Sequence, residues 1–122
     1  MDHTPGFLKI VDEARRNVRE ISVADAQARQ AAGARLVDVR EDTEYAAGHA
    51  AGAEHIGKGV IERDVERKVP DAGAELLLYC GGGFRSALAA DALQRMGYTN
   101  VWSVAGGWRA WQEAGAPVEG PR

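Results

Sequence analysis

The only cysteine of this chain lies in a segment whose composition suits nucleophilic chemistry. Cys80 follows an apolar run at residues 76–79 and precedes three glycines, an aromatic residue, an arginine and a serine, in the order CGGGFRS. The apolar run is typical of a strand buried on both faces, and residues 87–96 have the pattern of a helix. The sequence therefore predicts a strand, a tight loop and a helix. We refer to residues 80–85 as the Cys80 loop.

A loop of this composition is expected to stabilise an anion at its centre. Glycines let backbone amides turn inward into a concave nest, and the helix that follows adds the positive end of its dipole. Arg85 brings a fixed positive charge to the same loop. These surroundings favour the thiolate of Cys80, which is the nucleophilic form of a cysteine. An inert core cysteine is the alternative, but it would not need Gly81, Gly82 and Gly83 directly after it.

The composition of the chain limits its classes of function. With 122 residues it forms one domain with a single core, and with a net charge of −3 and no dense basic run we expect no nucleic acid and no membrane as partners. A single cysteine excludes an internal disulfide and a multi-cysteine metal cluster, so whatever leaves Cys80 goes to another molecule. The N-terminus has no apolar run of the signal-peptide kind. The expected location is therefore cytoplasmic, where a lone thiol stays reduced.

Other elements are predicted from apolar spacing and turn residues. Apolar side chains recur at helical spacing over residues 7–18, and we interpret residues 1–20 as an N-terminal helical extension that packs on the domain or on a partner. Ser22 is predicted to cap a second helix that ends at Gly33, with Asp25 as a weak capping box. Short helices are expected over 41–47, within 58–69 and over 108–114, and strands over 35–39, 53–56, 76–79 and 100–104.

Short apolar strands that alternate with helices predict an α/β domain with a mostly parallel sheet. Ligands of such sheets bind beyond the carboxyl ends of the strands, where Cys80, Arg40 and Gly106 are expected to lie. Asp38 and Arg40 share one face of a strand at a spacing of two, and Glu44 is within reach of Arg40 from the next helix. We interpret these three side chains as a buried ion-pair frame.

Five motifs, in this order, resemble the single-domain rhodaneses, a family of sulfurtransferases. The motifs are LVDVRE (36–41), EYAAGHAAGA (44–53), CGGGFRS (80–86), GYTNV (97–101) and GGWRAW with GAPV (106–118). The resemblance extends from about Ile21 to Val118, and it implies a rhodanese domain at 21–122 after the extension at 1–20. It further implies a five-stranded, mostly parallel sheet flanked by helices.

The resemblance also implies roles for individual residues. Cys80 matches the nucleophile that carries sulfane sulfur as a persulfide, and Arg85 is expected to act with it. Asp38, Arg40 and Glu44 match residues that give structural and electrostatic support. The expected substrate-binding residues are those whose amides or side chains surround the persulfide, namely Gly81, Gly82, Gly83, Phe84, Arg85 and Ser86.

Loop length separates two chemistries among related folds. A loop one residue longer occurs in protein phosphatases, whereas Cys80 is followed by five residues through Arg85, as in the sulfur-handling form. The expected donor is thiosulfate or a similar small molecule, and the expected acceptor is cyanide or a thiol of thioredoxin, glutathione or a protein. This ping-pong reaction requires no metal and no organic cofactor.

Several alternatives stay open at this point. The domain is either a stand-alone enzyme or a sulfur-carrier or adaptor module that a partner protein loads, and a phosphatase or arsenate reductase is disfavoured by loop length. Arg85 is either a ligand for an anionic donor or an ion-pair partner at the helix start. His49 is expected to pack rather than act as a base, Trp108 to border the site if its turn lies beside the Cys80 loop, and His3 to lie in a mobile terminus.

Overall fold

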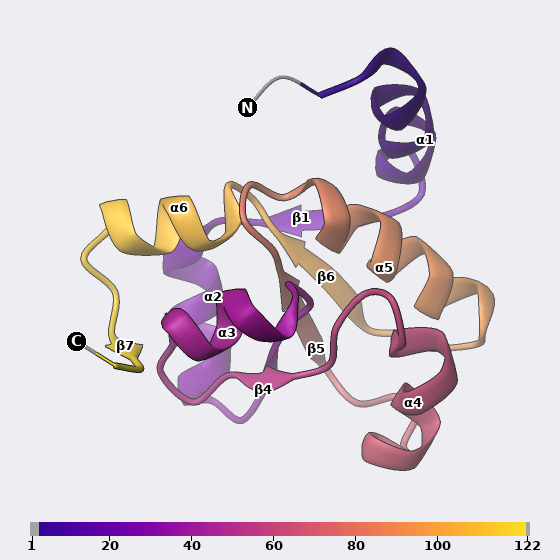
Figure 1. Cartoon of the computed structure of the whole chain (residues 1–122). Coiled ribbons are helices and arrows are strands. Elements are labelled where there is room, and N and C mark those ends of the chain that lie inside the picture. The colour runs from indigo at the N-terminus through magenta and orange to yellow at the C-terminus, as the bar shows by residue number, and fades with distance from the viewer. Residues whose placement is uncertain (1–2, 122) are drawn as a thin grey trace.

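A central sheet of five parallel strands, in the order β1-β6-β5-β2-β4, organises the computed structural model, which describes residues 3–121 (Figure 1). The strands are β1 (Arg19–Ile21), β2 (Arg35–Asp38), β4 (Glu54–His55), β5 (Leu76–Tyr79) and β6 (Val101–Val104). Two further short strands, β3 (His49–Ala50) and β7 (Val118–Glu119), pair antiparallel in a small separate sheet. The predicted α/β fold with a five-stranded parallel sheet is confirmed.

Helices cover both faces of this sheet. They are α1 (Pro5–Arg15), α2 (Val23–Ala31), α3 (Asp42–Ala47), α4 (Ile61–Lys68), α5 (Phe84–Arg95) and α6 (Gly107–Glu113). The core on one face includes Leu76 and Leu78 of β5 together with side chains of α4 and α5. The opposite core includes Leu77 and Tyr79 with side chains of α2 and α6. None of the helices within residues 3–121 is both long enough and apolar enough to cross a membrane.

Strand β5 lies at the centre of the sheet and leads directly into the Cys80 loop. All four of its residues are buried, as its continuous apolar composition predicts for a strand covered on both faces. Leu77 lies opposite Leu36 of β2 and Trp102 of β6, so both neighbours run parallel to β5. The residues after these three strands therefore meet at one edge of the sheet, as expected for Cys80, Arg40 and Gly106.

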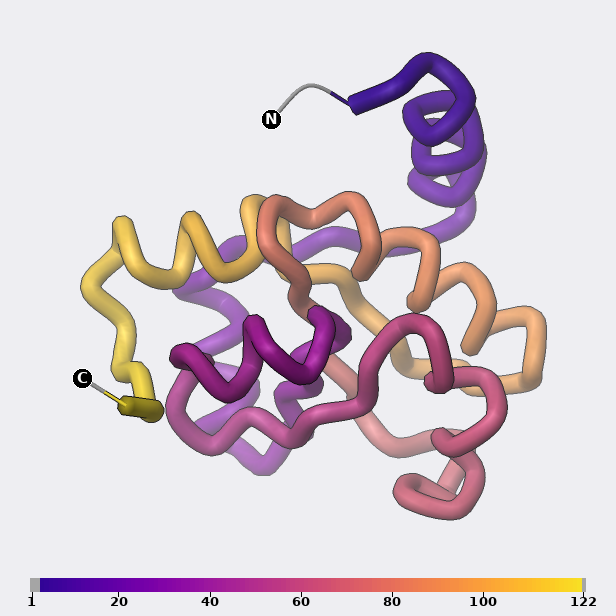
Figure 2. Tube along the Cα trace, in the orientation of Figure 1, coloured from indigo at the N-terminus to yellow at the C-terminus, as the bar shows by residue number. Residues whose placement is uncertain are grey.

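The N-terminal helix packs against the domain, beside α5 (Figure 2). Val11 and Ala14 supply its buried face, with 0% and 3% of their surfaces exposed. Packing on the domain was one of the two expected placements for this segment. The ring of His3, which precedes this helix, lies 4.2 Å from the ring of Phe84.

The boundaries of several elements differ from the sequence-based prediction. Helix α5 begins at Phe84 rather than at residue 87, because Gly83 takes a left-handed conformation (φ +97°) that lets the helix start at once. Strand β1 was not predicted, since only one of its three residues is buried. The cap of α2 is confirmed: the amide of Asp25 donates to the Ser22 hydroxyl at 3.1 Å.

Candidate active site

Cys80 lies at the end of β5 with 1% of its surface exposed. The backbone N–H of Gly83 donates a hydrogen bond to its sulfur at 3.1 Å, so an amide of the Cys80 loop points at Sγ. The backbone of Cys80 is held from the other side, where its carbonyl accepts a hydrogen bond from the N–H of Trp108 at 2.7 Å. The Gly83 amide is thus a donor aimed at the sulfur, which suits a sulfur atom that becomes an anion, while the Trp108 amide fixes the backbone of Cys80.

Two buried hydroxyl groups lie behind the sulfur. The Sγ of Cys80 is 3.5 Å from Oγ of Ser86, which in turn lies 2.8 Å from Oγ of Ser103 on β6. Both serines are completely buried. Ser86 was a predicted site residue, whereas Ser103 was missed. Its signal in the sequence is weak, because it is a single polar residue within the apolar strand at 101–104.

Glycines permit the close approach between the Cys80 loop and the turn that precedes α6. A Cβ atom at Gly107, whose φ is +52°, would overlap the carbonyl oxygen of Cys80. A Cβ atom at Gly83 would lie 3.4 Å from the backbone nitrogen of Gly106. The turn at 105–107 therefore packs directly against the loop, and this contact places the backbone of Trp108 at the site.

Arg85 forms a bidentate ion pair with Glu44 of α3, with distances of 2.7 and 3.1 Å. This hydrogen bonding raises the pKa of Arg85 above its usual value, and the nearby charge of Cys80 adds to the effect. The expectation that Glu44 reaches Arg40 is wrong, because the Arg40 guanidinium points inward to Asp38. Arg85 thus has the ion-pair role that the sequence left open.

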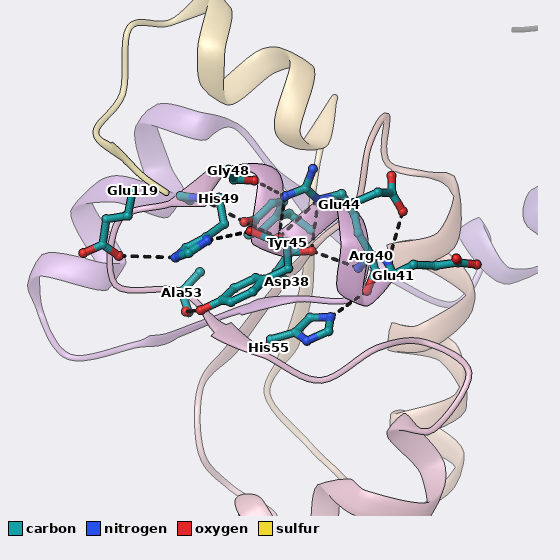
Figure 3. Close-up of polar contacts among 12 residues, drawn as sticks. Asp38, Arg40, Glu41, Glu44, Tyr45, Gly48, His49, Ala53, His55 and Glu119 are labelled. Atoms are coloured by element: carbon teal, nitrogen blue, oxygen red, sulfur yellow. Dashed lines mark hydrogen bonds and ion pairs between the residues drawn. The ribbon is translucent and has the colours of Figure 1, made fainter. Parts of the chain in front are cut away.

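The buried frame beside the site is confirmed for Asp38 and Arg40 (Figure 3). Their side chains are 0% and 4% exposed, and Arg40 Nη2 lies 2.8 Å from Asp38 Oδ2. The hydroxyl of Tyr79 donates to the same carboxylate at 2.6 Å, and Arg40 also donates to the carbonyl of Gly48. Burial, together with the bond to Asp38, raises the pKa of Tyr79 and keeps it protonated. The frame ties β2 and β5 to the segment after α3.

His49 and His55 pack on the ring of Tyr45, at centroid distances of 3.8 and 4.6 Å (Figure 3). Nδ1 of His49 lies 2.9 Å from the carbonyl oxygen of Tyr45, and Nε2 of His55 lies 2.8 Å from that of Arg40. His49 therefore has the packing and hydrogen-bonding contacts expected of it. The ring of Trp108 lies 4.8 Å from the Arg40 guanidinium, above the buried frame.

An open pocket of about 590 Å³ borders the Cys80 loop on the side of Arg85. Arg85 and residues 39–43 and 57–60 line it. The pocket therefore reaches the Cys80 loop at the side chain of Arg85. Within residues 3–121, no three side chains of His, Cys, Asp or Glu are grouped so that they could hold a metal ion.

The ion pair of Glu44 should make the stability of the domain depend on pH. The hydrogen bond from Arg85 is the main cause that lowers the pKa of Glu44 from 4.5 to about 2. A carboxylate with a lowered pKa stabilises the fold above its unfolded pKa and loses this contribution as the pH falls through the folded value. We therefore expect Glu44→Gln to weaken the decline in unfolding free energy between about pH 4.5 and about pH 2.

Urea denaturation at several pH values measures this decline for the wild type and for Glu44→Gln. Glu113→Gln is a matched control, because its side chain is 71% exposed and pairs with Arg109 only at 3.8 Å. The control should follow the wild-type curve, since exposed ion pairs contribute little. Parallel curves for Glu44→Gln and the wild type would contradict a stabilising pair with Arg85.

Comparison with known proteins gives a consistent result. The family model described as the rhodanese-like domain matches residues 22–114. Thiosulfate sulfurtransferase GlpE of Pseudomonas entomophila (strain L48) is 36% identical over 94 residues, which cover 77% of this chain and 84% of that protein. The corresponding protein of Pseudomonas fluorescens (strain SBW25) is 34% identical over 94 residues, with the same coverage of both chains.

Two solved structures are similar over nearly the whole chain. One is a protein of unknown function from Rhodopseudomonas palustris, described as a possible tyrosine phosphatase; it is 32% identical, has a TM-score of 0.82, and the match covers 98% of both chains. The other is the polysulfide-sulfur transferase homodimer of Wolinella succinogenes, which is 25% identical with a TM-score of 0.82. That match covers 95% of this chain and 88% of the other.

Proposed function

Because the chain belongs to the family of rhodanese-like domains, we propose that it is a sulfurtransferase that carries sulfur on Cys80. It moves sulfane sulfur from thiosulfate or a similar donor to cyanide or a thiol, such as that of thioredoxin, glutathione or a protein. The observation that carries this proposal is the hydrogen bond from the Gly83 amide to the buried sulfur at 3.1 Å. The activity in the names of the two GlpE relatives supports thiosulfate as a donor.

The reaction has two displacement steps. The Cys80 thiolate attacks the outer sulfur of thiosulfate, the bond between the two thiosulfate sulfurs breaks, and sulfite leaves with the electron pair. The persulfide on Cys80 is then attacked at its outer sulfur by cyanide or by an acceptor thiolate. The sulfur–sulfur bond of the persulfide breaks, and the Cys80 thiolate is restored as thiocyanate or the acceptor persulfide leaves.

Hydrogen-bond donors compensate for the burial of the anionic sulfur. The Gly83 amide is one donor, and the hydroxyl of Ser86 is a second when it turns its proton toward Sγ. Ser103 can then donate to Ser86, so that neither buried hydroxyl lacks a partner. A preorganised donor of this kind contributes about 2.7–4 kcal/mol in other enzymes. Ser86 and Ser103 thus act as a hydrogen-bonded pair and not as nucleophiles.

A sulfur carrier loaded by a partner protein is the alternative function. Cys80 is 1% exposed, so a small donor and a partner's persulfide alike must pass the loop to reach the sulfur. Phosphatase activity, which the description of the Rhodopseudomonas palustris protein suggests for that protein, is disfavoured here by the five residues from Gly81 to Arg85. A smaller ring of amides suits one sulfur atom better than a phosphate.

Steady-state rates of thiocyanate formation distinguish these functions. With thiosulfate and cyanide both varied, a sulfurtransferase gives parallel double-reciprocal lines, because the donor leaves before the acceptor reacts. A carrier gives no thiocyanate from thiosulfate but is loaded by a partner's persulfide. Release of phosphate from a phenyl phosphate, without thiocyanate formation, would overturn the proposal.

Arg85 should matter more for sulfur loading than His49. We expect Arg85→Ala to slow loading by thiosulfate about tenfold, since the change removes a charge near the sulfur and leaves Glu44 unpaired there. His49→Ala should change the loading rate less than about twofold, because its ring contacts Tyr45 and not the Cys80 loop. Rapid-quench mass measurement gives both rates. Equal decreases of the loading rate in Arg85→Ala and His49→Ala would place His49 in the active site.

A further inference from the structure

The N-terminal helix contacts the Cys80 loop directly, at Phe84. The ring of Phe84 lies 4.2 Å from the ring of His3 and 6.3 Å from that of Phe7. The guanidinium carbon of Arg15 lies 4.7 Å from the centre of the same ring. Phe84 is also the first residue of α5, so these contacts act where the loop becomes a helix. The segment before the family match thus packs on a loop within that match.

Arg15 makes a second contact with this loop, to its backbone. Its Nη2 donates a long hydrogen bond of 3.5 Å to the carbonyl of Gly83. Its Nε is buried and has no hydrogen-bond partner among the described residues, and the nearest carboxylate in an ion pair with it, that of Glu20, is 3.8 Å away. Arg85, in contrast, is paired closely with Glu44. The charge of Arg15 therefore stays less compensated than that of Arg85, beside the loop that carries Cys80.

The backbone conformation of Gly83 determines whether its amide points at the sulfur of Cys80. Its amide is the donor to Cys80 Sγ, and its φ of +97° belongs to a region that glycine enters and leaves at little cost. Without a side chain, Gly83 is fixed only by what its neighbours and its peptide groups contact. Arg15 contacts the Gly83 carbonyl, which is part of the peptide bond between Gly83 and Phe84, and the ring of Phe84, which follows that bond.

We propose that Arg15 is a positioning residue for the Cys80 loop: it fixes the Gly83–Phe84 peptide and thereby the backbone torsions of Gly83, which keep the N–H of the preceding peptide pointed at the sulfur. The planar guanidinium lies over the Phe84 ring and reaches the adjacent carbonyl at the same time, a combination that the ammonium group of a lysine does not provide. Arg15 acts through Gly83 and Phe84. The relevance of this contact to sulfur transfer rests on the proposed function, whereas its effect on the Cys80 thiol does not.

The test compares Arg15→Gln and Arg15→Lys with Arg16→Gln, a control on the next residue, which is exposed. Two readouts are the amide signal of Gly83 in nitrogen-15 NMR spectra and the rate at which iodoacetamide alkylates Cys80. We expect both Arg15 variants to move the Gly83 signal upfield, as its hydrogen bond to the sulfur lengthens. Alkylation should slow about tenfold in Arg15→Gln, while Arg16→Gln stays within about twofold of the wild type.

Val11→Ala separates the role of Arg15 from that of helix docking. Val11 is fully buried under α1, so its truncation loosens the helix but leaves the Arg15 side chain intact. The proposal would be overturned if Val11→Ala changed the Gly83 amide signal and the alkylation rate as much as Arg15→Gln does. It would also be overturned if Arg15→Lys kept the wild-type Gly83 signal, or if Arg15→Gln had the wild-type signal and the wild-type alkylation rate. If thiosulfate fails to load the wild type while the Arg15 variants behave as expected, the proposed function fails and this inference stands.

Discussion

Replacement of Cys80 by serine should abolish sulfur loading completely and leave the fold intact. The hydroxyl of serine is far less acidic than a thiol, and oxygen does not form a persulfide, so no covalent intermediate is possible. The new Oγ would still accept the Gly83 amide and still face Ser86. Since its hydrogen-bonding groups remain satisfied, we expect the free energy of unfolding to change by only about 1 kcal/mol or less. Thiocyanate assays and urea denaturation measure the two effects.

Ser86→Ala is the matched control for Cys80→Ser. It removes one donor behind the sulfur and keeps the nucleophile, so we expect slower loading, by about tenfold to a hundredfold, with loading still complete at long times. Residual turnover in Cys80→Ser above that of buffer would contradict a role for Cys80 as the sulfur carrier. If loading were lost completely in both folded variants, the Ser86 hydroxyl would be essential for sulfur transfer and would not merely accelerate it.

Gly107→Ala should cause the second-largest effect, on stability and loading together. A methyl group there would overlap the Cys80 carbonyl oxygen and lie 2.9 Å from its carbonyl carbon and 3.1 Å from that of Gly81. These are backbone atoms, which cannot move aside without displacing the Cys80 loop. We expect a loss of about 2–5 kcal/mol in unfolding free energy, from the left-handed backbone and the overlap together. Loading of the remaining folded protein should fall more than about tenfold.

Gly115→Ala isolates the overlap from the backbone strain. Gly115 also has a left-handed conformation, with φ of +69°, but a Cβ atom there would meet nothing within 4 Å. It should therefore cost about 1–2 kcal/mol and leave the loading rate unchanged. Denaturant unfolding and single-turnover loading, measured on both variants, give the comparison. Equal losses of stability in Gly107→Ala and Gly115→Ala would show that the close approach to Cys80 contributes nothing.

Local sequence signals were sufficient to predict four of the five strands of the sheet and the tight loop that follows β5. Strand β5 is an uninterrupted apolar run, and strands buried on both faces have this composition. The glycines at 81–83 predict a tight turn before a helix, and Ser22 is a typical helix cap. These signals depend on residues close together in the chain. The strand β1 carries no such signal, because it is a three-residue edge strand with a single buried side chain.

Contacts between distant segments were not predictable in the same way. The sequence predicts the pair of Asp38 and Arg40 but also places Glu44 near Arg40, whereas in the packed structure Glu44 pairs with Arg85. Ser103 pairs with Ser86 across 17 positions of sequence. Arg15 reaches the carbonyl of Gly83 across 68 positions, because α1 folds back on α5. Such pairings follow from tertiary packing, which no local pattern of residues encodes.

Intact-mass measurement after incubation with thiosulfate shows whether Cys80 takes up sulfur from a small donor. The native chain should gain the mass of one sulfur atom, and this gain should disappear when cyanide is added, because cyanide removes the outer sulfur of a persulfide. Cys80→Ser should show no gain under the same conditions. A native chain that gains no sulfur from thiosulfate or from any other sulfane donor, including a partner's persulfide, would contradict the account, as would a gain that persists in Cys80→Ser.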